Sequence, residues 1–278
     1  MSSGAVVAYI KRIAGCRVGH AGTLDPEAAG VLPVMVGRAT RLLDHLDDAK
    51  KCYIGEIAFA GSTTTQDAQG VITKQPAGVP DEETLLKVLL SFKGKQLQTP
   101  PGFSAIKRNG VPLYKQARKG IEIEVEKREV TIHGIELLGR SSADSYIMKV
   151  NCSRGTYIRT LCNDIGEALG MPAHMRFLLR TSSAGFDIRN SSTLEEISDI
   201  DSLTAHLIAP DAPLKHLSEY IIPESQAVQA INGVALPANE ATEGETVRMY
   251  LRGRFLGIAQ CNEGKYHFKV INIDHNDW

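Results

Sequence analysis

The chain has 278 residues, of which 43% are hydrophobic and 23% charged, and its formal net charge is −1. This composition excludes a disordered or fibrous protein and suits one large globular domain, or one domain with a small appendage. No apolar run approaches the length of a membrane span, and the first residues do not form a signal peptide, so we expect no membrane association.

The five cysteines are scattered along the chain and form no C-x-x-C pair. This spacing favours neither a disulfide framework nor a zinc site, and free thiols are typical of a reducing compartment. The sequence contains no glycine-rich nucleotide-binding loop either. We therefore expect a cytoplasmic protein that needs no metal and no cofactor.

A run of glycine and proline surrounds the carboxylate of Asp25. Gly22 and Gly30 permit backbone angles that other residues resist, and Pro26 pushes the residue before it toward an extended or turn conformation. We expect a stiff loop that leads into an apolar strand over 31–36. A carboxylate on such a loop suits a nucleophile or a general base, although an Asp in a Gly/Pro loop more often caps neighbouring amides.

Hydrophobic periodicity and capping signals predict the elements in chain order. The predicted helices cover 5–14, 38–46, 81–92 with Asp81 as N-cap, 114–118, a segment that begins near 156, and a last helix that follows a capping box at 192–195. The predicted strands cover 50–59, 121–125, 130–138 and 146–152, with a hairpin turn at Asn109-Gly110. These elements predict an α+β fold with a mixed, largely antiparallel sheet and flanking helices.

Two prolines, Pro210 and Pro213, mark a domain boundary. We expect a large first domain over 1–213. Short β-like runs separated by glycines predict a small β-rich domain over 214–278.

Basic residues gather in the middle of the chain, where residues 93–128 carry nine Lys or Arg against three Glu. A local excess of this kind can bind phosphates on a protein without net positive charge, whereas charge alone favours a solvated surface. The candidate phosphate contacts are Lys107, Arg108, Lys115, Arg118 and Lys119.

Three blocks, in the same order, resemble the TruB family of tRNA pseudouridine synthases. The first is GTLDP at 22–26, followed by GVLP at 30–33 and GRAT at 37–40. The second runs from SAIK to a glycine at 104–120, and the third is SRGTYIRTL at 153–161. The resemblance covers about residues 1–210, and the tail is loosely similar to the PUA-type RNA-binding domain of the family.

The resemblance implies that the chain isomerises a uridine at position 55, in the T-loop of tRNA, to pseudouridine. Asp25 would be the nucleophile, acting after the target base has left the stack. It could attack C1′ of the ribose or remove a 2′ proton to give a glycal, and both routes stay open. Arg159 would pair with Asp25, and an Arg beside a carboxylate lowers its pKa and orients it.

The resemblance also implies a set of substrate contacts. Tyr53 would stack on the target base and Leu178 would touch it. His20 would contact the flipped state, and Tyr157 would hold the base or handle a proton after isomerisation. The partner would be the T-arm stem-loop of tRNA, bound by a monomer.

The sequence departs from the family pattern at two places. TruB-type enzymes normally begin with a strand that bears a Lys-Pro-x-Gly segment just before the position where this sequence begins. We therefore expect one strand of the core sheet and one basic residue to be missing. The family also has two arginines in a row where this chain has Leu179-Arg180, which removes one candidate contact to a phosphate or carboxylate.

Three alternatives belong to other classes of protein. The first is a catalytically inactive chaperone that binds tRNA in the same groove. The second is a glycosidase, which needs a second carboxylate about 5–10 Å from Asp25, and Glu27 is the nearest in sequence. The third is the archaeal and eukaryotic relative that works with a guide RNA. The short tail and the LRT run at 179–181 argue against this alternative.

Overall fold

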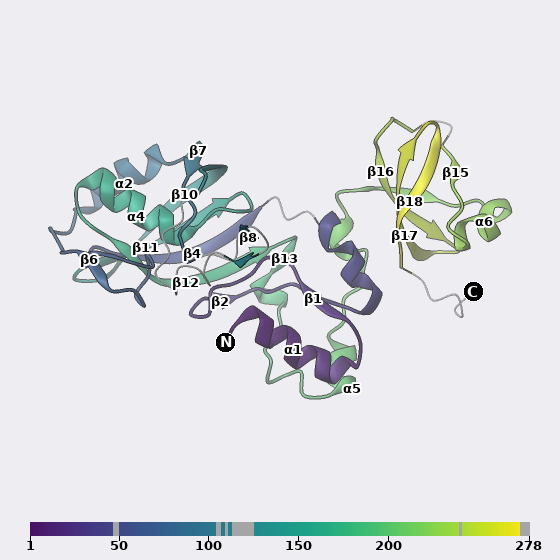
Figure 1. Ribbon diagram of the computed structural model, residues 1–278, viewed down its shortest axis with the longest axis horizontal. Coiled ribbons are helices and arrows are strands. Elements are labelled where there is room, and N and C mark those ends of the chain that lie inside the picture. The colour runs from purple at the N-terminus through teal and green to yellow at the C-terminus, as the bar shows by residue number, and fades with distance from the viewer. Residues whose placement is uncertain (47–49, 104–106, 109–110, 113–124, 239–240, 273–278) are drawn as a thin grey trace. The chain divides into compact units, whose positions relative to one another are not determined.

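The computed structural model describes residues 1–46, 50–103, 107–108, 111–112, 125–238 and 241–272 (Figure 1). The chain forms two compact units. The first comprises 1–2, 22–32 and 48–190, and the second comprises 3–21, 33–47 and 191–278. Within the described part of the chain, no helix is long and apolar enough to cross a membrane.

The first unit is built on a seven-stranded sheet with the strand order β13-β12-β4-β11-β10-β7 and the short β2 beside β12. All neighbours along this order are antiparallel, whereas β2 runs parallel to β12. This arrangement confirms the predicted mixed, largely antiparallel α+β sheet. The strands are β2 (Ala29–Gly30), β4 (Lys51–Ala58), β7 (Gly94–Gln98), β10 (Arg128–Ser142), β11 (Ser145–Cys152), β12 (His174–Ser183) and β13 (Phe186–Asp187).

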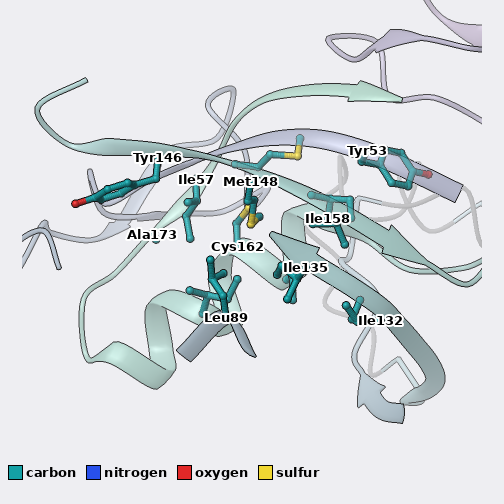
Figure 2. Close-up of a cluster of buried hydrophobic side chains, with 14 of the residues drawn as sticks. Tyr53, Ile57, Leu89, Ile132, Ile135, Tyr146, Met148, Ile158, Cys162 and Ala173 are labelled. Carbon is teal, nitrogen blue, oxygen red and sulfur yellow. The ribbon is translucent and has the colours of Figure 1, made fainter. Parts of the chain in front are cut away.

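Two helices, α2 (Glu82–Ser91) and α4 (Ile158–Leu169), pack on this sheet and bury its core. Leu89 of α2 and Cys162 of α4 join Ile57 and Met148 of the sheet in one cluster of side chains with no exposed surface (Figure 2). Asp81 accepts a hydrogen bond from the backbone N–H of Thr84, so the predicted N-cap of α2 is confirmed.

Two small hairpins lie outside the main sheet. In the first, β5 (Ser62–Thr63) pairs with β6 (Ile72–Lys74). In the second, β8 (Lys107–Arg108) pairs with β9 (Val111–Pro112), and these strands flank the predicted turn at 109–110. That turn, the predicted helix at 114–118 and most of the predicted strand at 121–125 lie outside the described residues.

The second unit contains a five-stranded sheet with the order β14-β16-β17-β18-β15. It confirms the predicted β-rich C-terminal domain, while the boundary at 213/214 stays a prediction. The strands of this sheet are β14 (Ser218–Ile221), β15 (Leu236–Pro237), β16 (Thr246–Leu251), β17 (Arg254–Asn262) and β18 (Lys265–Ile271). The other elements of this unit are α1 (Ser3–Ala14), β1 (Val18–His20), β3 (Val34–Val36), η1 (Gly37–His45), α5 (Ile200–Ala205), η3 (Ala212–Leu214), η4 (Glu224–Gln226) and α6 (Ala227–Ile231).

Three local predictions were wrong in detail. The strand expected over 31–36 is limited to β3, where it pairs with β1, and the helix expected over 38–46 is the 3-10 helix η1. The capping box expected at 192–195 starts no helix, because the Glu196 carboxylate accepts from the backbone N–H of Thr193 in a local turn. The capping box lies instead at Asp199 and Ser202, and it starts α5.

Replacing Gly30 with Ala should destabilise the first unit more than the same change at Gly78. Both glycines have a positive φ, +108° and +129°, but a Cβ at Gly30 would lie 2.1 Å from the carbonyl oxygen of Arg180. Among the described residues, apart from the two chain neighbours of Gly78, no atom lies within 4 Å of a Cβ at that position. Displacing that carbonyl breaks a strand pairing, so we expect an extra loss of about 1–3 kcal/mol, or roughly 3–9 °C in Tm. Thermal unfolding followed by circular dichroism measures the difference, and equal losses would contradict the assigned clash.

Candidate active site

The loop that carries Asp25 is held in a fixed shape by its own backbone. Gly22 and Gly30 adopt positive φ values of +72° and +108°, as the sequence predicts. Between them, the backbone N–H of Ala28 donates to the carbonyl of Asp25 and closes a turn. The Asp25 side chain remains 37% exposed, so it can meet a substrate from solution.

Arg159 pairs with both carboxylate oxygens of Asp25. Its Nε lies 2.8 Å from Oδ2, and its Nη2 donates to Oδ1 at 3.1 Å. Arg159 lies in the first turn of α4, and its side chain is only 4% exposed. The structure thus brings together two residues that lie 134 positions apart in the chain, which the resemblance implied and local sequence patterns could not show.

The guanidinium of Arg159 is itself held from three further sides. Nη1 donates to the carbonyl of Thr65 at 3.0 Å, and Nη2 donates to the carbonyl of Phe103 at 3.0 Å. Nη1 also lies 3.6 Å from Oδ2 of Asp67. These contacts leave Arg159 little freedom, so it fixes the orientation of the Asp25 carboxylate.

Asp67 is a site residue that sequence reasoning missed. Its Oδ1 accepts from the Thr65 hydroxyl and from the backbone N–H of Gln69, which aims the carboxylate at Arg159. Gln66, at a φ of +62°, accepts a hydrogen bond from Thr160 and holds the loop against α4. The polar run at 62–70 lacks periodicity, so nothing in the sequence pointed to this partner.

The pKa of Asp25 lies above its usual value. Burial of the carboxyl raises it most, Arg159 lowers it, and the negative charge of Asp67 raises it. The lowering that Arg159 was expected to cause is therefore outweighed by burial. Both carboxylates contact the guanidinium of Arg159. The described residues contain no group of three or more His, Cys, Asp or Glu side chains that could hold a metal ion.

Arg180 is the one arginine that this chain keeps where the family has two in a row, and the sequence assigned it no contact. The structure places it in β12 with 1% exposure, where it donates to the carbonyls of Val31, Gly22 and Thr23. Its described hydrogen-bond partners are thus all backbone carbonyls of the Asp25 loop.

Tyr157 is the N-cap residue of α4, two positions before Arg159. The side-chain amide of Gln98 donates to the Tyr157 carbonyl at 3.0 Å and accepts from its N–H at 2.8 Å. Gln98 is 3% exposed, and sequence reasoning did not select it. This pairing fixes the backbone from which both Tyr157 and Arg159 project.

The remaining predicted substrate contacts fall into two groups. Tyr53 and Leu178 are 7% and 6% exposed and belong to the core cluster of the first unit, so a base could contact only their small exposed edges (Figure 2). His20 ends β1 in the second unit, opposite Val34 of β3.

The predicted phosphate contacts fall mostly outside the described structure. Lys107 and Arg108 form β8, of which the backbone alone is described. Lys115, Arg118 and Lys119 lie outside the described residues. All five therefore stay predictions.

Comparison with known proteins decides the family. Residues 11–158 match the profile described as TruB family pseudouridylate synthase, N-terminal domain. Residues 159–229 match the tRNA pseudouridylate synthase B C-terminal domain, and 218–267 match pseudouridine synthase II TruB, C-terminal. The chain belongs to the TruB family of pseudouridylate synthases. It is thus an isomerase by family, and the resemblance based on the three motif blocks is confirmed.

Individual relatives agree with this assignment. The tRNA pseudouridine synthase B of Alkaliphilus oremlandii is 39% identical over 280 residues, which cover 98% of this TruB chain and 93% of that protein. That of Bacillus subtilis is 41% identical over 84% of this chain and 80% of its own length. Among solved structures, one titled as a Cbf5-Nop10-Gar1 complex matches 99% of this chain and 80% of that chain with a TM-score of 0.71 and 25% identity.

Two substitutions should move the pKa of Asp25 in opposite directions. Asp67→Asn removes a negative charge and keeps the oxygen acceptor for Thr65 and Gln69, so the pKa of Asp25 should fall. Arg159→Gln removes the positive partner, so the pKa should rise. The pH titration of the Asp25 carboxyl carbon by NMR, assigned with Asp25→Asn, measures both changes.

Asp201→Asn is the matched control for these titrations. Asp201 is an exposed carboxylate on α5 of the second unit, so its removal should leave the Asp25 titration unchanged. A rise of the Asp25 pKa in Asp67→Asn would contradict the assigned electrostatics.

Proposed function

We propose that this TruB enzyme converts the uridine at position 55, in the T-loop of tRNA, to pseudouridine. The relatives named above are tRNA pseudouridine synthases B, which supports tRNA as the substrate. The observation that carries the proposal is the two-contact pairing of Asp25 with a buried, immobilised Arg159. It supplies one oriented carboxylate on a loop that stays open to solvent.

One carboxylate is enough for this reaction. The N1–C1′ glycosidic bond breaks, the uracil turns, a C5–C1′ bond forms, and the proton on C5 is lost while N1 gains one. Asp25 either attacks C1′ or takes the 2′ proton, and either step requires its ionised form. Arg159 supports both by favouring the charged carboxylate against the effect of burial.

The target uridine must leave the base stack before Asp25 can reach its ribose. In our proposal His20 contacts the RNA in this flipped state, and Tyr53 and Leu178 meet the base through their exposed edges. Tyr157 lies beside Arg159 on the chain and holds the base or handles the C5 proton. A T-arm stem-loop bound to one monomer, with Lys107 to Lys119 at its phosphates, completes the proposed complex, which would form in the bacterial cytoplasm.

Asp25→Asn should abolish the reaction and leave tRNA binding intact, because asparagine keeps the shape of the side chain but is not a nucleophile. Release of tritium from a T-arm stem-loop labelled at uridine C5 measures the reaction, and filter retention of the RNA measures binding. Glu27→Gln is the matched control, since Glu27 lies in the same loop and is exposed.

The wild-type enzyme and Glu27→Gln should release tritium at equal rates. Release by Asp25→Asn would show that another group is the nucleophile. Binding without release by the wild type would instead favour the chaperone, and loss of activity in Glu27→Gln would revive the two-carboxylate hydrolase.

A further inference from the structure

Arg180 contacts the Asp25 loop on both sides of the reactive residue. Its Nη2 donates to the carbonyl of Gly22 at 2.8 Å and its Nη1 to that of Thr23 at 3.4 Å, before Asp25. Its Nε donates to the carbonyl of Val31 at 2.8 Å, after Asp25. One planar side chain therefore joins the two ends of the loop.

The backbone of Arg180 holds the same loop a second time. The backbone N–H of Val31 donates to the Arg180 carbonyl at 2.9 Å, and Gly30 of β2 lies opposite Arg180 in a parallel pairing. The approach is so close that any Cβ at position 30 would overlap the Arg180 carbonyl. We call this combination the loop clamp: the bonds of Arg180 to Gly22, Thr23 and Val31, together with its pairing opposite Gly30.

The need for directional donors explains why a charged residue lies here. Arg180 is 1% exposed, so its guanidinium has lost nearly all its hydration, which costs free energy. If packing alone were required here, an apolar side chain of similar volume would avoid that desolvation cost. Arginine differs from such a residue by its rigid fork of N–H donors, which can reach several carbonyls at once. A Cβ at Gly22 would lie 3.3 Å from Nη1 of Arg180 and 2.9 Å from Nζ of Lys51, so glycine leaves room for both cations.

The strand that bears Arg180 also bears one of the proposed base contacts, and the neighbouring strand bears another. Leu178 lies two positions earlier on β12, so both side chains project from the same face of the strand. Tyr53 lies directly opposite Arg180 on the neighbouring strand β4. Because β12 pairs with both β4 and β2, the strand pairing fixes the proposed base-binding residues relative to the loop that carries Asp25.

We propose that Arg180 is a positioning residue for the isomerisation, which sets the distance and angle of Asp25 through the loop clamp. This inference rests on the proposed function for its kinetic test. Arg159 acts on the Asp25 carboxylate itself, whereas Arg180 touches only the backbone of the loop. Loss of the clamp should therefore impair the chemical step and leave tRNA affinity unchanged.

The kinetic test compares Arg180→Met and Arg180→Lys with the same two changes at Arg176. Arg176 is the matched control because it lies on the same strand, four residues earlier, and bonds to Asp144 instead of the loop. In single turnover, Arg180→Met should slow tritium release by about 10²-fold, the usual effect of a misplacement near 1 Å. The release rate of Arg180→Lys should lie between the rates of Arg180→Met and the wild type. Neither change at Arg180 should alter the Kd for the stem-loop.

The structural test does not depend on activity. Amide hydrogen exchange of peptides that cover 22–31 should accelerate in Arg180→Met, while peptides of β4 and β11 keep wild-type protection. The Arg176 variants should exchange as the wild type does in the loop. If Arg180→Met does not fold, Arg180→Lys carries both comparisons.

Three results would overturn the loop clamp as a positioning device. One is a wild-type single-turnover rate in the Arg180 variants, and another is a rate loss explained entirely by weaker tRNA binding. The third is faster exchange throughout the sheet, which would show a general structural role. If the wild type itself releases no tritium, the proposed function fails, and the exchange of 22–31 alone then decides whether the clamp exists.

Discussion

The site depends on the fixation of one carboxylate by groups from distant parts of the chain. Asp25 lies on a short loop without helix or strand around it, and such a loop cannot orient a side chain by itself. Arg159 supplies the direction and the charge, because four backbone or carboxylate groups hold its guanidinium. Helix α4 carries that guanidinium, and the polar loop at 62–70 and the carbonyl of Phe103 both contact it.

Two buried arginines divide the task of holding Asp25. Arg159 touches the oxygens of the carboxylate, so it affects both protonation and orientation. In the described structure the Arg180 side chain bonds to carbonyls at the ends of the loop, so it affects position. Protonation of the Asp25 carboxylate and the position of its loop thus depend on different residues. The glycines at 22 and 30 give the space that the second arginine needs.

Local sequence patterns predicted the fold well where one period dominates. The alternation in β4 and the cap at Asp81 are examples, because burial on one face and a free helix end leave few alternatives. The Asp25 loop was also predictable, since glycines at positions 22 and 30 indicate positive φ values. The pairing of Asp25 with Arg159 required the family resemblance, because no local pattern encodes a contact across 134 residues.

What the sequence did not reveal has a common physical cause. Asp67, Gln98 and Arg180 act through bonds to backbone or to other side chains in the interior, and these bonds exist only after the sheet has formed. The sequence therefore assigned no role to Arg180, because a lone arginine in a strand does not show that its partners are buried backbone carbonyls. The pKa of Asp25 likewise depends on burial, which the loop sequence alone does not specify.

The sequence distance between the loop and its clamp has a consequence for synthesis on the ribosome. Gly22 and Arg180 are 158 residues apart. At translation rates of about 5–20 residues per second, roughly 8–30 s separate the synthesis of the Asp25 loop from that of the arginine that holds it. The nascent chain therefore carries Asp25 in an unconstrained segment through most of its synthesis, and the reactive geometry forms only when β12 joins the sheet.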